Sequence, residues 1–314
     1  MKIGSVVHLL AFALLAAAPL RAQEHAPEAA KVDIITPHIT DGNHMEIPWP
    51  NRTLFKEVTL PSFEPVHIGP VTLDLSPTKH VVFLFIGALL LFVLLTVASR
   101  RHVRATRAGS APSAGPNVAE AMILYIRNEV ILPNVGHRGE GFVPYLLTVF
   151  FFILTLNLLG LVPFGSTATG NISVTATLAI MTFITVEIAG IRANGWGYLN
   201  TLFYWNNDLP VFMRPVMFLI MSPVEMIGKL TKPFALAIRL FANMTAGHIV
   251  VLAFVGLFFS FAGLVPTFSS LIAIAPLAMA VLIMVLEIFV AFLQAFIFTL
   301  LSSVFIGQIR EAHH

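Results

Sequence analysis

Two long apolar stretches near the C-terminus contain polar side chains of the kinds that transfer or steer protons. Arg239 lies within one of them, seven residues after Lys232, which corresponds to about 10 Å of helix rise. A charge at such a depth is costly in lipid, so intramembrane arginines are typical of ion paths or partner charges. The alternative is an arginine that extends its side chain to the cytoplasmic headgroups.

The helical face that carries Arg239 favours contact with another helix. Ala235, Ala242 and Ala246 precede or follow Arg239 by four, three and seven residues, so they share its face. Asn243, four residues after Arg239, lies there too. Small residues allow a second helix to approach closely. The pattern predicts that Arg239 is presented to a partner helix.

Three further polar residues fit the register of an antiparallel helical hairpin, in which residues at equal height have numbers with a constant sum. Arg239 with Gln294 and His248 with Glu287 give nearly the same total. Both pairs put the apex near Thr267. We therefore expect two polar layers, one formed by Arg239 and Gln294 and the other, nearer the outside, by His248 and Glu287.

The second layer is suited to proton transfer. His248 is nine residues from Arg239, roughly on the opposite face of a regular helix, so it is expected to face into the chain's own bundle. Histidine titrates near neutral pH, and a histidine beside a carboxylate can pass protons. A metal site is the alternative chemistry, although two ligands without a third are thin evidence for it.

The composition requires lipid as the solvent for most of the elements that position these residues. Of 314 residues, 57% are apolar and 11% charged, whereas a soluble domain has roughly a quarter charged residues. The chain has no cysteine, which excludes disulfides and thiolate chemistry. It also has no Gly-x4-Gly-Lys-Ser/Thr loop, the commonest motif for ATP binding.

Five apolar segments are predicted to cross the membrane. They are residues 81–98, 144–162 and 174–191, followed by the hairpin arms at about 223–259 and 267–309. Each arm is far longer than the roughly 20 residues that a crossing needs, so the hairpin must tilt steeply. The cluster of Arg100, Arg101, Arg104 and Arg107 puts the end of the first span in the cytoplasm. The N-terminus is then extracytoplasmic and the C-terminus cytoplasmic.

The remaining segments are assigned from composition. Residues 1–22 read as a secretory signal peptide, with an uncleaved anchor helix as the alternative. Residues 23–77 form a small extracytoplasmic segment with strand-like alternation at 55–60 and 66–75. Residues 78–117 hold the first span and its basic loop, residues 118–131 an amphipathic stretch at the cytoplasmic surface, and residues 196–220 an interfacial or re-entrant segment. The expected fold is an all-α integral membrane protein with five transmembrane helices, including the tilted hairpin.

Four motifs resemble the a subunit of F-type ATP synthases. They are Arg-Leu-Phe-Ala-Asn-Met-Thr-Ala-Gly-His at 239–248, Leu-Gln-Ala-Phe-Ile-Phe at 293–298, Asn-Leu-Leu-Gly-Leu-Val-Pro at 157–163 and Ala-Thr-Gly-Asn-Ile-Ser-Val-Thr at 168–175. The resemblance extends from about residue 118 to the C-terminus, so it implies that 118–314 is the proton-channel domain.

The resemblance implies a role for each polar residue of the hairpin. Arg239 matches the arginine that faces the carboxylates of the rotating c-ring and keeps the two half-channels apart. Glu225 matches an acidic position in the cytoplasmic exit path. The positions that match the outer half-channel are Asn243, His248, Glu287 and Gln294.

Two of these positions vary within the family. In some members the acid and the histidine of the outer layer are exchanged relative to His248 and Glu287. An acid that some members carry in the second span is Gly160 here, so the resemblance implies an expectation that proton entry uses a different polar residue.

The implied function is that of a proton-translocating stator subunit in a bacterial inner membrane. Its expected partners are the c-ring, the peripheral-stalk b subunits and membrane lipid, with protons as the transported ion, no cofactor, no nucleic acid and no bond chemistry of its own. One alternative is a secondary transporter with Arg239 as an anion anchor, although the inverted repeats typical of that class are missing. The other is an intramembrane enzyme that uses His248 and Glu287.

Overall fold

The computed structural model describes residues 40–48, 55–68, 71–73, 76–107, 114–136, 139–162, 165–198, 214–262 and 269–311. The expected signal peptide at 1–22 and the expected hairpin apex at Thr267 lie outside the described residues. All distances and contacts below concern the described part of the chain.

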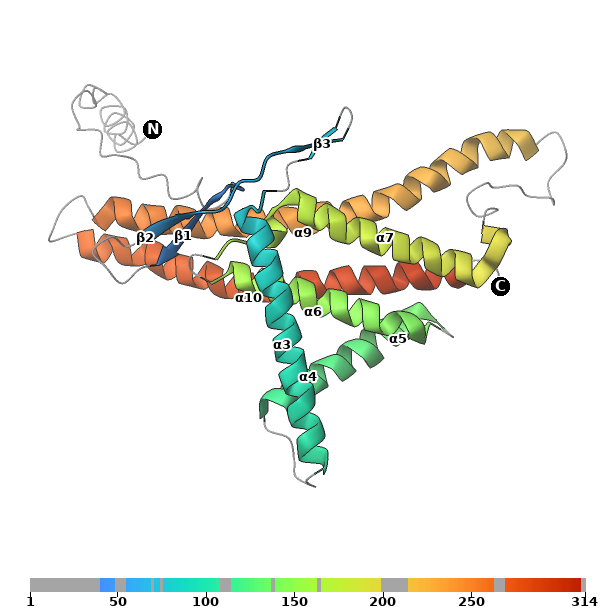
Figure 1. Ribbon diagram of the computed structural model, residues 1–314, viewed down its shortest axis with the longest axis horizontal. Helices are drawn as coiled ribbons and strands as arrows, with labels where there is room; N and C mark the ends of the chain where they lie inside the picture. Colours follow the sequence, from blue (N-terminus) through green and yellow to red (C-terminus); the bar gives the residue numbers. More distant parts are fainter. Residues whose placement is uncertain are drawn as a thin grey trace, which may run out of the picture. The chain divides into compact units, whose positions relative to one another are not determined.

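Five helices in this part are long and apolar enough to cross a membrane. They are α3 (Lys79–Arg107), α6 (Val143–Gly160), α7 (Ile172–Asn194), α9 (Arg214–Ala262) and α10 (Ser269–Glu311). Figure 1 shows α9 and α10 alongside each other, with α6 and α7 next to them. The predicted all-α membrane fold with five spans and a long hairpin is confirmed.

The hairpin begins earlier than the sequence suggested. Residues 214–220, expected to be part of an interfacial segment, form the first two turns of α9. Pro215 lies in the first turn, where a missing N–H costs nothing. Pro223 and Pro233 lie inside the helix, and prolines within membrane helices are tolerated when neighbouring groups satisfy the freed carbonyls. Pro223 therefore does not mark the start of the arm.

Short strands precede the first span. β1 (His44–Pro48) pairs antiparallel with β2 (Phe55–Thr59), and β3 (Val66–Ile68) pairs with β4 (Val71–Leu73). The strand expected at 66–75 is thus two short strands. Gly69-Pro70 separates them in the sequence, a dipeptide typical of turns.

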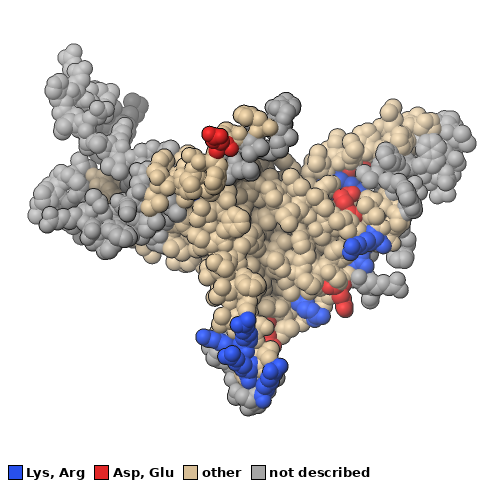
Figure 2. All heavy atoms as spheres, viewed as in Figure 1, with Lys and Arg blue, Asp and Glu red and all other residues tan. Residues whose placement is uncertain are grey.

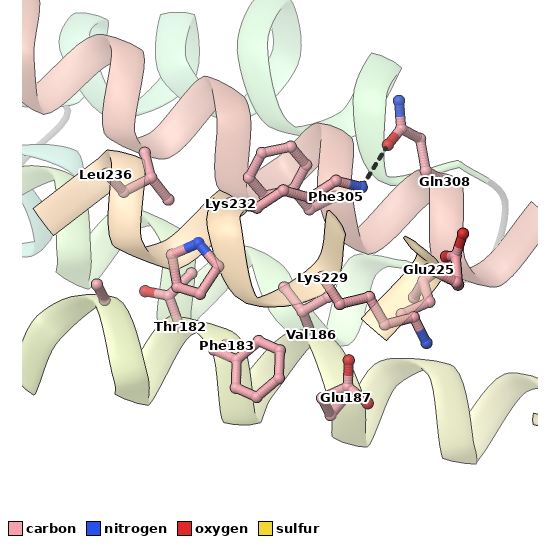
Figure 3. A pocket seen from close by; sticks show the side chains of 13 residues that line it. Thr182, Phe183, Val186, Glu187, Glu225, Lys229, Lys232, Leu236, Phe305 and Gln308 are labelled. Carbon is pink, nitrogen blue, oxygen red and sulfur yellow. Dashed lines mark hydrogen bonds between the residues drawn. The ribbon is translucent and has the colours of Figure 1, made fainter. Parts of the chain in front are cut away.

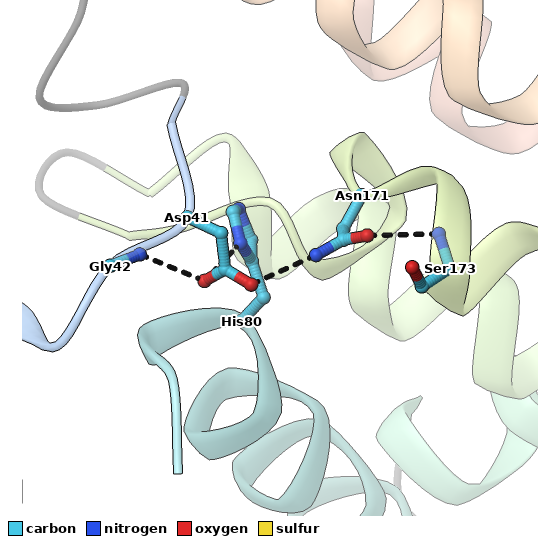
Figure 4. Close-up of polar contacts among 5 residues, drawn as sticks. All are labelled: Asp41, Gly42, His80, Asn171 and Ser173. Carbon is cyan, nitrogen blue, oxygen red and sulfur yellow. Dashed lines mark hydrogen bonds and ion pairs between the residues drawn. The ribbon is translucent and has the colours of Figure 1, made fainter. Parts of the chain in front are cut away.

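Asp41, just before β1, connects three parts of the chain (Figure 4). Its carboxylate lies 2.7 Å from Nδ1 of His80 at the start of α3 and accepts a hydrogen bond of 2.9 Å from Nδ2 of Asn171. Asn171 in turn accepts from the backbone N–H of Ser173 and so caps α7. This contact fixes the starts of α3 and α7 relative to the segment before them.

The core lies where α6 packs against α10. Fully buried Phe150 and Ile153 on α6 belong to the same apolar cluster as Ala291 and Ala295 on α10. Alanines at these positions let the two helices approach closely. Phe292 packs edge-on against Phe150, with ring centroids 5.8 Å apart.

The segment between α3 and α6 is part of this core. Its helical elements are α4 (Ala114–Tyr125), the π-helical η2 (Ile126–Ile131), α5 (Leu132–Val135) and the short η3 (Glu140–Phe142). Its amphipathic character was expected, and buried Ile126 and Ile131 supply the apolar face. Near the end of α10, the Arg310 guanidinium donates to the carbonyl of Val135, at 3.3 Å.

The close approach of α5 to α10 depends on Gly307. A Cβ at Gly307 would overlap the backbone carbonyl of Asn134, whereas a Cβ at Gly256 on α9 would meet open space. We expect Gly307→Ala to lower the free energy of unfolding by about 1–3 kcal/mol, because overpacking forces backbone shifts. Gly256→Ala is the matched control and should be neutral or stabilising by up to about 1 kcal/mol. Thermal unfolding of the purified protein in detergent measures both, and equal midpoints would contradict this packing.

Candidate proton-transfer site

The face of α9 that carries Arg239 is exposed. Ala235, Ala242, Asn243 and Ala246 are exposed with it, as the shared helical face predicted. The opposite face of α9 is buried and packs on the bundle through Leu236, Leu240 and Met244. Within the part of the chain that is described, the guanidinium makes no ion pair, so it is available to a group outside this chain.

Gln294 fixes the height of Arg239 in the hairpin. Its amide Nε2 donates to the backbone carbonyl of Arg239 at 2.8 Å, and its side chain is buried. This contact confirms the predicted register of the Arg239–Gln294 layer. It uses only the backbone of Arg239 and leaves the guanidinium on the other side of the helix.

The second layer lies at the level of Gly247. Buried Glu287 packs so closely on Gly247 that a Cβ there would overlap its carboxylate. His248 follows in the chain, and its Nε2 lies 3.3 Å from Oγ1 of Thr167. His248 therefore faces residues of its own chain, while Arg239 faces away from them.

Thr167 was not among the predicted residues, and its side chain packs against Gly160. It precedes the short helix η4 (Ala168–Gly170), and its side chain fills the space that a Cβ at Gly160 would need. A larger side chain at position 160 would displace Thr167 from His248. Thr167 and its polar contact to His248 thus occupy the space beside Gly160.

A buried asparagine also lies beside this layer. Asn157 on α6 is fully buried; its Nδ2 donates to the carbonyl of Ala291 at 3.3 Å, and its Oδ1 accepts from Thr169 Oγ1 at 2.8 Å. An asparagine inside an apolar span was the sequence signal for this position. The hydrogen bonds connect α6, α10 and η4 around the space near Glu287 and His248.

Glu225 lies on the other side of Arg239 along α9. It lines a cleft of about 200 Å³ between α7, α9 and the end of α10, shown in Figure 3. Glu187, Lys229 and Lys232 line the same cleft, and none of the three had been assigned a role in proton transfer. Glu225 is fourteen residues before Arg239 and Gly247 eight after it, or about 21 and 12 Å of helix rise. The cleft and the Glu287 layer are therefore separated by the level of Arg239.

Comparison with known proteins shows the family of this chain. A family model described as "ATP synthase A chain" matches residues 81–307, which include α3, α6, α7, α9 and α10 apart from a few terminal residues. "ATP synthase subunit a 2" of Chlorobaculum tepidum is 42% identical over 253 residues, 79% of this chain and 67% of the relative. "ATP synthase subunit a" of Chloroherpeton thalassium is 45% identical over 235 residues, 75% of this chain and 65% of the relative. That of Anaeromyxobacter dehalogenans is 45% identical over 189 residues, 60% of this chain and 47% of the relative.

The matched part of this chain thus spans about two-thirds or less of the length of these relatives. The family model covers more than half of the chain, and the identity exceeds 40% in each relative. The chain belongs to the ATP synthase A chain family.

Proposed function

We propose that the chain is the proton-translocating stator subunit of a rotary F-type ATP synthase and provides two half-channels that load and unload carboxylates of the c-ring. The observation that carries the proposal is the position of Arg239. It lies on an exposed, alanine-lined face between two polar regions that are separated along α9.

The outer half-channel consists of Glu287 and His248 with Asn243 and Gln294. Two hydroxyls around them support a hydrated path. Among the described residues, the buried Oγ atoms of Ser166 and Thr245 have no hydrogen-bond partner. Buried polar groups without a protein partner are typically satisfied by water. The hydroxyls therefore suit a region that water enters.

The inner half-channel is the cleft that contains Glu225. A proton that leaves a c-ring carboxylate reaches the cytoplasm through this cleft. Arg239 favours the ionised form of each arriving carboxylate because the charges are opposite. It also keeps a proton from passing directly between the two half-channels, since a fixed positive charge between them repels it.

The chain performs no bond chemistry in this scheme. One proton that moves through 100 mV releases about 2.3 kcal/mol, so the c-ring must collect several such steps to drive ATP synthesis elsewhere in the complex. The partners are the c-ring on the Arg239 face and the peripheral-stalk b subunits. The exposed position of Arg239 favours an opposing helix over a small anion bound in a transporter's pocket.

The positive charges support a bacterial inner-membrane orientation. Figure 2 shows Lys and Arg gathered at the C-terminal end of α3, where Arg100, Arg101 and Arg104 are exposed. Basic residues are enriched in cytoplasmic loops, which makes this end cytoplasmic, the segment before α3 extracytoplasmic and the C-terminus cytoplasmic. Large exposed apolar residues on α3, such as Phe85 and Phe92, suit contact with lipid.

The charge of Arg239 is tested in membrane vesicles that carry the complete complex. We expect Arg239→Ala to abolish ATP-driven proton pumping, because the c-ring carboxylates would no longer be held ionised beside the stator. Quenching of a pH-sensitive dye measures pumping. Arg101→Ala removes an exposed arginine far from the hairpin and should leave pumping unchanged. Coupled pumping by Arg239→Ala would refute the proposed function.

The position of Glu287 is tested by adding a single methyl group opposite its carboxylate. Gly247→Ala should slow proton pumping by about tenfold, since overpacking of roughly 1–3 kcal/mol is relieved most easily by moving the Glu287 side chain. Gly256→Ala, in open space on the same helix, serves as the control. Equal pumping rates in the two variants at equal subunit abundance would exclude Glu287 from the path.

A further inference from the structure

Three polar side chains that no motif singled out form a hydrogen-bonded chain at the inner cleft. The Tyr198 hydroxyl donates to the Glu187 carboxylate, and Lys229 Nζ donates to the Tyr198 oxygen at 3.0 Å. The Lys229 ammonium also lies over the tyrosine ring, 4.4 Å from its centroid. Glu187 comes from α7, Lys229 from α9, and Tyr198 follows the short helix η5 (Gly195–Gly197).

The tyrosine is a fixed part of this cluster. Its side chain is buried, and a Cβ at Gly190 would overlap its ring. Burial first, and then the hydrogen bond to Glu187, raise the pKa of Tyr198 well above its ordinary value. The phenol therefore keeps its proton at any physiological pH. Tyr198 is a positioning residue that orients Glu187 and does not itself exchange protons.

Glu187 retains one oxygen for other partners. Tyr198 bonds to Oε2, whereas Oε1 is buried and has no hydrogen-bond partner among the described residues. Glu187 lines the cleft of about 200 Å³, which is room for several water molecules at about 30 Å³ each. A carboxylate that lines the cleft, with one oxygen held by Tyr198 and the other buried without a partner among the described residues, has the geometry of a proton acceptor.

The cluster also lies closer to Arg239 than Glu225 does. Lys229 precedes Arg239 by ten residues and Glu225 by fourteen, or about 15 and 21 Å along the helix. Glu187 is at the level of Lys229, because Tyr198 connects them. A proton that moves from the level of Arg239 through the cleft thus meets Glu187 before Glu225.

We propose that Glu187, oriented by Tyr198 and Lys229, is an additional proton-accepting carboxylate of the inner half-channel. The inference rests on the proposed function. In the synthesis direction, water in the cleft carries the proton from the c-ring carboxylate to the Glu187 carboxylate. The protonated Glu187 then releases it through cleft water toward Glu225 and the cytoplasm. The charged or titratable groups that face Glu187 across the cleft are Tyr198, Lys229, Lys232 and Glu225.

The alternative for the same residues is a tether that holds the end of α7 against α9. Glu187→Gln separates the two roles, because the amide oxygen still accepts the Tyr198 hydrogen bond while the side chain no longer takes up a proton. Tyr198→Phe does the opposite, since it removes the hydrogen bonds from Tyr198 to Glu187 and from Lys229 to Tyr198 but keeps the Glu187 carboxylate. If these residues act only as a tether, the rate of ATP synthesis should fall in Tyr198→Phe and stay unchanged in Glu187→Gln.

The experiment uses the complete complex in inverted vesicles, whose outer face is the cytoplasmic one. ATP synthesis is measured as the pH of the external buffer is varied. We expect Glu187→Gln to lower the rate by about tenfold or more, the scale of a lost acid–base group, and to change the dependence of the rate on external pH, because a proton-accepting group has been removed from the exit path. Glu187→Asp should restore part of the rate. Glu129→Gln, at an exposed carboxylate in η2, is the matched control.

The outcomes separate the inference from the function on which it rests. Wild-type rates and an unchanged pH profile in Glu187→Gln, with Arg239→Ala inactive in the same vesicles, would overturn the role of Glu187 alone. A lower rate of ATP synthesis in Tyr198→Phe with a wild-type rate in Glu187→Gln would also overturn the proton-accepting role of Glu187, in favour of the tether. Coupled activity in Arg239→Ala would overturn the proposed function itself.

Discussion

A guanidinium held at the exposed face of a membrane helix constrains everything around it. Its ionised state is unfavourable in lipid unless a negative group or water is near, so the face must be covered by something outside this chain. The hydrogen bond from Gln294 to the Arg239 backbone carbonyl holds α10 against α9. It does not involve the guanidinium, which stays available to another group. The buried apolar residues on the opposite face of α9 fix the rotation of the helix, and the arginine consequently points outward.

The polar groups of the bundle are divided by this residue. Glu287, His248 and the Asn157 hydrogen bonds lie on one side of its level, and the cleft with Glu225 and Glu187 lies on the other. In the proposed function this separation has a direct physical meaning, because a continuous polar path would let protons cross without turning a rotor.

Much of this arrangement could be predicted because it depends on one helical hairpin. Span lengths, the alanine face of Arg239 and the pairing with Gln294 follow from periodicity and antiparallel geometry within two continuous segments. The Glu187 cluster could not be found in that way. It brings together a helix end, a short turn and a second helix, and no spacing within one segment encodes their contact. The same holds for Thr167, whose position beside Gly160 and His248 depends on how η4 folds back over α6.

The Asp41 contact has a consequence for exchanging parts between relatives. The region that the family model matches begins at residue 81, one position after His80, so it excludes both members of the Asp41–His80 pair. Asn171, which caps α7, lies inside it. A chimera that joined the shared helices to a foreign leader would keep the cap and lose the carboxylate that holds it. The segment before residue 81 is therefore bonded to the start of α7 through Asp41 and Asn171, and the boundary of the family model does not coincide with a structural one.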